Sequence, residues 1–175
     1  RHLCSNLRPK GVLLGAIHAF CGNYLMQDIL DGHPDILRME HGFLNNNLYF
    51  ICLMLAEMKS SDILAEFWKL YNCEVRNNNI QFPEFDKPDI FSRKMKEMLA
   101  ESECFTSQEL FVMFHIAYAA MHSTEKTSMK EVIIYFEPHF VDRNICRRYS
   151  VWLNEGNIHG VIISIARNAC IRAGS

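Results

Sequence analysis

The chain has 175 residues, of which 49% are hydrophobic, and a formal net charge of −2 at pH 7. This length and apolar content indicate one domain with a substantial core and exclude a disordered chain. The near-neutral charge excludes a global basic field that would recruit nucleic acid or an anionic membrane, so any anion site must be local. No apolar run in the sequence reaches the roughly 18 residues of a membrane span.

The first predicted unit is a strand, a turn and a helix. Residues 11–17 form a short run that is apolar on both faces, which is typical of a strand buried in a parallel sheet. Gly22 and Asn23 favour a tight turn, and apolar residues then recur at helical spacing over residues 24–30. We therefore expect the amino end of a helix at the carboxyl edge of the first strand, where anions bind.

The next residues carry a resemblance to a known family. Residues 30–37, Leu-Asp-Gly-His-Pro-Asp-Ile-Leu, resemble the start of the sulfotransferases that use 3′-phosphoadenosine 5′-phosphosulfate (PAPS). The family loop usually reads Arg-Ser-Gly-Thr-Thr-Leu-Leu, whereas this chain has Phe20 in place of the basic residue and Asn23-Tyr24 in place of the threonines. The resemblance implies that the 5′-phosphosulfate is bound by residues of this loop, namely His18, Cys21, Gly22, Asn23 and Tyr24.

A general base is expected after the second strand, a short one within residues 35–40. In tyrosylprotein-type sulfotransferases a glutamate at about this distance past the loop takes the proton from the acceptor. The resemblance therefore implies Glu40 as the base, with His41 as a neighbour that could share the task. The alternative is a solvated Glu-His pair at the end of an element.

A helix-rich segment follows. Four helices are predicted here: a buried one from Leu48 onward within residues 43–58, two with one apolar face over residues 63–71 and 88–101, and a strongly apolar one over residues 106–121. Residues 72–86 are expected to be irregular, and His115, which lies among apolar residues, is expected to be a core residue rather than a ligand.

The last third of the chain alternates strands with a helix. Residues 132–136 read as a strand, and in related sulfotransferases a Lys-x-Pro-like segment after this strand lies close to the sulfuryl group. Here the basic residue would be His139, and the alternative is a residue that only leads into the next helix, over residues 142–154. Residues 159–166 form the third convincing strand.

Arg167 follows that third strand, and Ser175 stands eight residues later. The 3′-phosphate segment of PAPS sulfotransferases has the same order of apolar strand, Arg and Ser. An Arg fork and a hydroxyl can bind a ribose 3′-phosphate through charge-assisted hydrogen bonds. The resemblance thus implies which residues bind each end of the nucleotide: the loop after the first strand binds the 5′-phosphosulfate, and Arg167 and Ser175 bind the 3′-phosphate.

The resemblance implies an α/β chain with a three-layer P-loop-like fold, in which a central parallel sheet is flanked by helices and a helix-rich insertion separates strands. One sulfotransferase-like domain would span residues 1–175 and continue beyond Ser175. The implied reaction transfers a sulfuryl group from PAPS to a hydroxyl or amine, with a carbohydrate as the acceptor by analogy, and leaves adenosine 3′,5′-bisphosphate. The alternative is a catalytically inactive relative that binds a nucleotide or a partner.

Two further observations concern other classes of nucleotide-binding protein and the use of cysteine. No G-x-x-x-x-G-K-[ST] motif is present, which disfavours a P-loop kinase or NTPase. The seven cysteines are dispersed without a C-x-x-C pair or metal-ligand spacing, so we expect no metal site and a cytoplasmic protein. The alternative location is the Golgi lumen, for a protein whose membrane anchor lies outside this sequence.

Overall fold

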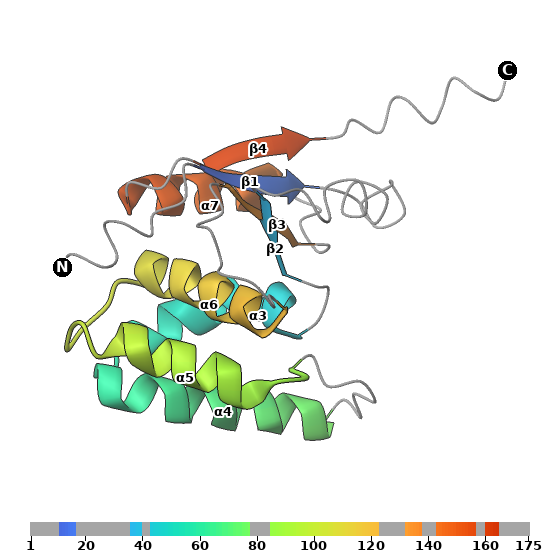
Figure 1. The fold of residues 1–175 in the computed structure, drawn as a ribbon. Coiled ribbons are helices and arrows are strands. Elements are labelled where there is room, and N and C mark those ends of the chain that lie inside the picture. Colours follow the sequence, from blue (N-terminus) through green and yellow to red (C-terminus); the bar gives the residue numbers. More distant parts are fainter. Residues whose placement is uncertain are drawn as a thin grey trace, which may run out of the picture.

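Four strands and five helices make up the described part of the chain (Figure 1). The computed structural model describes residues 11–16, 36–39, 43–77, 85–122, 132–137, 143–156 and 160–164.

Four consecutive helices form the largest part of the structure, which we call the helical body. They are α3 (Phe43–Leu55), α4 (Ser60–Asn77), α5 (Pro88–Leu99) and α6 (Ser107–His122). Together they separate β2 (Ile36–Arg38) from β3 (Val132–Glu137) in the sequence. The expected helices are confirmed, with one difference: α4 continues to Asn77 through residues that were expected to be irregular.

Local sequence signals explain where two of these helices begin. Pro88 opens α5, at a position where the missing N–H costs nothing. Before α6, the backbone N–H of Glu109 donates to the Thr106 hydroxyl oxygen at 3.2 Å, and the Thr106 N–H donates to the Glu109 carboxylate at 2.8 Å. This reciprocal pair is a capping box, and it satisfies two backbone donors that the helix itself cannot pair.

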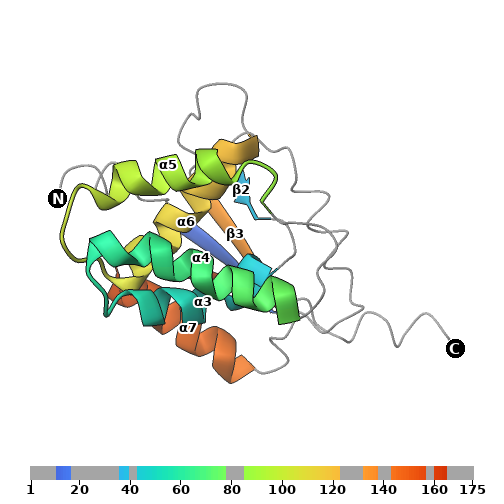
Figure 2. The ribbon, with the colours of Figure 1, turned by 90° about the horizontal axis from the view of Figure 1, so that it is seen from below.

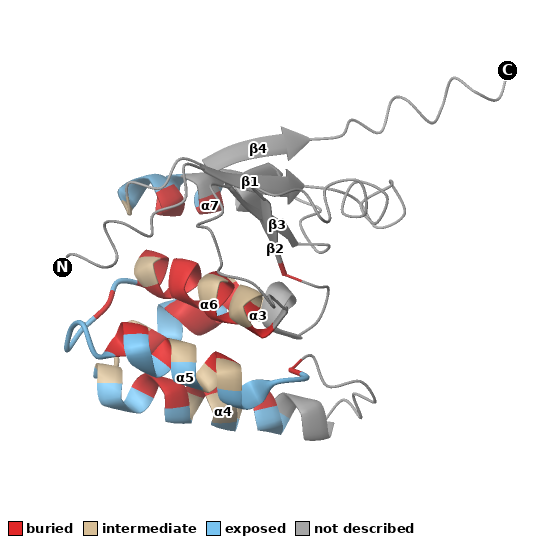
Figure 3. Ribbon diagram, in the orientation of Figure 1, coloured by how far each residue is buried: buried red, intermediate tan, exposed pale blue. Residues whose placement is uncertain are grey.

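Most of the described core lies inside the helical body, and Met39 and three residues of the last helix complete it. Seven aromatic side chains gather where α4, α5 and α6 meet: Phe67, Trp68, Tyr71, Phe85, Phe91, Phe114 and Tyr118. Phe67 lies at the centre, with its ring 4.9 Å from that of Phe114 and 5.4 Å from that of Phe91. Helix α6 is buried on nearly every side, since each residue from Leu110 to His115 is buried (Figure 3). A helix that is apolar all round belongs in the interior of a protein.

The four strands form one parallel sheet in the order β2-β3-β1-β4. Strand β1 (Gly11–Ala16) lies between β3 and β4 (Gly160–Ser164) and pairs with both. Strand β2 pairs only with β3 among the described strands, so it lies at one edge of the sheet.

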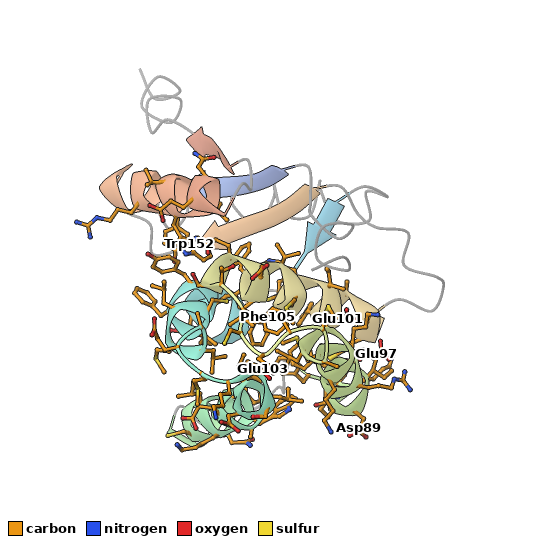
Figure 4. All side chains as sticks on the ribbon, turned by 90° about the vertical axis from the view of Figure 1, so that its left-hand side faces the viewer. Asp89, Glu97, Glu101, Glu103, Phe105 and Trp152 are labelled. Atoms are coloured by element: carbon orange, nitrogen blue, oxygen red, sulfur yellow. The ribbon has the colours of Figure 1, made fainter. Side chains whose placement is uncertain are left out.

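Helix α7 (Arg143–Glu155) joins the sheet to the helical body. It packs against β4 and β1, and its Tyr149 ring lies 4.1 Å from that of Tyr49 on α3. Its Trp152 extends toward the helical body (Figure 4). Tyr149, Trp152 and Leu153 of this helix are buried, whereas Val151 is exposed.

The described elements lie in layers: the sheet is followed by one layer of helices and then by a second layer of helices. Helices α3 and α6 lie beneath β3 and β2, and α4 and α5 lie beneath α3 and α6 (Figures 1 and 2). The sheet is therefore an outer layer of the described part, with its neighbouring helices α3, α6 and α7 joined to one another through side-chain contacts.

The predicted fold class is wrong. It placed a parallel sheet at the centre of a three-layer P-loop-like sandwich, whereas the part described to side-chain level is 78% helical and contains no strand. The physical reason is that the apolar surfaces of α3–α6 bury one another and need no sheet between them.

Candidate functional site at the carboxyl edge of the sheet

Three strands end together at one edge of the sheet. Glu137 of β3 is paired in register with Ala16 of β1, and Ala16 is paired with Ser164 of β4. Each of these residues is the last of its strand. Because the strands are parallel, their carboxyl ends lie side by side, and neighbouring strands are about 4.8 Å apart. In open parallel sheets this edge is where ligands bind.

All of the site residues predicted from the sequence lie outside the described residues. They are His18, Cys21, Gly22, Asn23, Tyr24, Glu40, His41, His139, Arg167 and Ser175. The described strands do fix the points from which the chain enters these segments.

Two of those points are neighbours. The chain leaves the sheet at Ala16 toward the residues predicted for the 5′-phosphosulfate, and at Ser164 toward Arg167. Ala16 and Ser164 are direct register partners. The two predicted phosphate segments thus start from adjacent strands at the same edge.

Strand β2 ends before it reaches the edge at which the other three strands end. Its last residue, Arg38, is in register with Ile134, three positions before the end of β3, which corresponds to roughly 10 Å along the strand. The next residue, Met39, is buried and belongs to the same hydrophobic cluster as the helical body. The chain has therefore turned from the sheet toward the helices just before Glu40.

The titratable groups buried in the helical body belong to its core. His115 is fully buried, its Nδ1 lies 2.8 Å from the Phe111 carbonyl oxygen, and burial lowers its pKa from 6.5 to about 4. Burial also raises the pKa of the Cys52 thiol well above its ordinary value. Both groups are therefore uncharged at neutral pH, and the expectation that His115 is a core residue is confirmed.

The outer charges of the helical body face water. Asp89, Glu97, Glu101 and Glu103 are exposed (Figure 4), and Glu97 forms a surface ion pair with Lys94 at 3.1 Å. The thiols of Cys73 and Cys104 are exposed as well. Within the described residues, no group of three or more His, Cys, Asp or Glu could hold a metal ion.

The register singles out two residues that the sequence reading did not select, Glu137 and Ser164. Glu137 stands just before Pro138-His139, and His139 was chosen because it is the basic residue of that segment. The signal for Glu137 was its place as the last residue of a strongly apolar strand, where a carboxylate is unusual.

Comparisons of the chain with protein-family models, curated proteins and solved structures give no match. Among the described residues, no helix combines the length and the apolar character needed to cross a membrane.

Proposed function

We propose that this chain binds PAPS and transfers its sulfuryl group to a hydroxyl or amine acceptor. The observation that carries the proposal is the in-register parallel pairing of β1 with β4, which ends in the pair Ala16 and Ser164. It supports the proposal because the nucleotide's two phosphate ends would be held by the segments that follow these two strands.

The two segments offer the right chemistry for a nucleotide with phosphates at both ends. The segment after β1 contains Gly22 and Asn23, whose backbone amides suit a 5′-phosphosulfate, and His18 adds a side-chain donor. The segment after β4 contains Arg167 and Ser175, whose guanidinium and hydroxyl suit a 3′-phosphate. This pairing of functions with segments rests on the resemblance to PAPS sulfotransferases.

Calorimetric titration with adenosine 3′,5′-bisphosphate tests the nucleotide site. We expect micromolar binding that weakens at least about tenfold in Arg167→Ala, since a charge-assisted contact to phosphate is worth about 1.5–3 kcal/mol. Arg172→Ala is the matched control and should bind almost as well as the unchanged protein. Adenosine 5′-monophosphate, which lacks the 3′-phosphate, should bind more weakly and be insensitive to Arg167→Ala. Absence of binding by the unchanged protein would refute the proposal.

A second candidate is a relative that binds the nucleotide without transferring sulfate. The observation in its favour is the loop itself, where Phe20 stands in place of the basic residue and Asn23-Tyr24 in place of the threonines. Incubation with PAPS and a panel of sugar, phenol and amine acceptors separates the two candidates. Formation of a sulfated product supports the enzyme, and nucleotide binding without any product supports the inactive relative.

The finer parts of the proposal rest on analogy and composition. A carbohydrate acceptor is proposed by analogy with relatives that act on glycans. A cytoplasmic location is proposed because seven dispersed cysteines fit a reducing compartment.

A further inference from the structure

We infer that two copies of this chain associate through the outer face of α3, where three apolar side chains are exposed to water. They are Phe50, Leu53 and Met54, which are 61%, 38% and 52% exposed. We call these three residues the α3 stripe. The inference is independent of the proposed sulfuryl transfer, since it uses only side chains in and beside α3 and α7.

The α3 stripe is one continuous surface. Residues three and four apart are neighbours on a helix, so Leu53 and Met54 both lie next to Phe50. The other face of α3 is buried, through Leu48, Ile51, Cys52 and Leu55. Apolar residues thus occupy both faces of this helix, and only one of these faces is covered by the core. A helix that is apolar all round is normally covered on every side.

The exposed positions of a nearby helix are of a different kind. On α5 they include the charged residues Arg93, Lys96 and Glu97. Helix α3, by contrast, contains no charged residue from Phe43 to Leu55. Because charged side chains are the usual residues of a helix face that stays in water, the outer face of α3 has the composition of an interface.

The apolar surface continues onto α7, which lies beside α3 (Figure 2). The Tyr49 ring of α3 lies 4.1 Å from that of Tyr149 and 4.9 Å from that of Trp152. Leu53 follows Tyr49 by one helical turn and therefore borders this contact. Val151, between the two α7 residues in the sequence, is 54% exposed and adds a fourth apolar side chain.

The exposed apolar area matches what a weak homodimer needs. At about 200 Å² for a large side chain, the exposed fractions of the α3 stripe and Val151 amount to roughly 400 Å² per copy. A small specific interface buries about 600 Å² per partner, of which about 65% is apolar in homodimers, again roughly 400 Å². We therefore expect reversible association with a Kd on the order of 10 µM.

The charges beside this surface also favour a second copy as the partner. The exposed charged residues next to it have both signs: Glu57, Arg148 and Glu155. A strongly acidic or basic partner, or an anionic membrane, would meet like charges as well as opposite ones there. In a two-fold contact each residue faces a different residue of the other copy, so a rim with both signs can complement itself.

Sedimentation velocity tests the contact, at concentrations from about tenfold below to about tenfold above the expected Kd. The weight-average mass of the unchanged protein should rise from that of one chain toward that of two. Phe50→Glu would bury two carboxylates in the contact and should weaken association at least about tenfold. Ala65→Glu, at an exposed position of α4, is the matched control and should associate like the unchanged protein.

Urea unfolding at low protein concentration checks that Phe50→Glu folds, and Met54→Glu is the second variant if it does not. A single chain at every concentration overturns the inference. An equally tight dimer in the folded variants also overturns it, since another surface would then form the contact. A monomer that binds neutral phosphatidylcholine vesicles through Phe50 overturns it in favour of a lipid surface. None of these outcomes bears on nucleotide binding, which calorimetry with adenosine 3′,5′-bisphosphate tests separately.

Discussion

The indole N–H of Trp152, near the end of α7, donates a hydrogen bond to the hydroxyl oxygen of Ser107, the first residue of α6, over 2.9 Å. In return, the side-chain amide of Gln108 donates to the Trp152 carbonyl oxygen at 2.8 Å. All three residues are buried. These two bonds connect the element before β4 to the helical body, and they make α7 sensitive to small changes at the start of α6.

Replacing Ser107 by Ala should destabilise the protein by about 1–3 kcal/mol, because the buried Trp152 indole N–H loses its acceptor. Urea unfolding followed by tryptophan fluorescence measures the change. Ser102→Ala removes a comparable hydroxyl from an exposed loop and should stay within about 0.5 kcal/mol. Equal effects of the two substitutions would show that the Trp152 bond contributes nothing.

Gly156→Ala should also be destabilising, by about 1–3 kcal/mol, because a Cβ at residue 156 would lie 2.6 Å from Cγ and 2.7 Å from Cβ of Gln108. The cause is lack of space, since the Gln108 stem and not a flexible end occupies the position. Gln108→Ala removes the Cγ contact but keeps the Cβ contact. The double variant should therefore be more stable than the sum of the single effects predicts, and strict additivity in urea unfolding would contradict this packing.

The buried His115 should make stability depend on pH. Because burial lowers its pKa from 6.5 to about 4, the unfolded chain takes up a proton at His115 below pH 6.5 while the folded protein does not. Its contribution is fully present above pH 6.5 and is lost as the pH falls toward 4, by up to about 3 kcal/mol. His115→Leu should flatten the fall in unfolding free energy between these pH values, as measured by urea titrations. Parallel pH curves for the two proteins would contradict the shift.

Phe67→Ala should destabilise the helical body by about 3–5 kcal/mol, because this fully buried ring contacts others from α5 and α6 and its loss leaves a cavity. Phe50→Ala removes the same ring from the surface of α3, where Phe50 is 61% exposed, and should cost little. Denaturant midpoints of the two variants provide the comparison, with Phe67→Leu as a milder change if the alanine variant fails to fold.

The individual elements were readable from the sequence because their signals are local. The capping box at Thr106 and Glu109 and the apolar stripe that buries Phe91 and Met95 both depend on residues within a few positions of one another. The end of α4 was not predicted, because Arg76 and Asn77 give no strong signal that a helix stops or continues.

The stacking of the elements could not be read in the same way, since it depends on which apolar faces meet. A clue was present in α6, where the unbroken buried run from Leu110 to His115 requires neighbours on every side. The sequence reading gave the strands the central place that α6 and its neighbours occupy. The candidate site could be predicted only as a set of segments, and the register added Glu137 because pairing between distant strands is invisible to local patterns.

Strands β2 and β3 are direct neighbours in the sheet, although residues 39–131 lie between them in the sequence. Joining them in an unfolded chain would carry a large loop-closure entropy, whereas α3 with α4, α4 with α5 and α5 with α6 are contacts between helices that follow one another in the sequence. We therefore expect α3–α6 to assemble first during refolding. Their assembly brings β2 and β3 closer together, and the strands then pair. Substitutions such as Phe67→Leu should then slow refolding, whereas those in β3 should mainly speed unfolding.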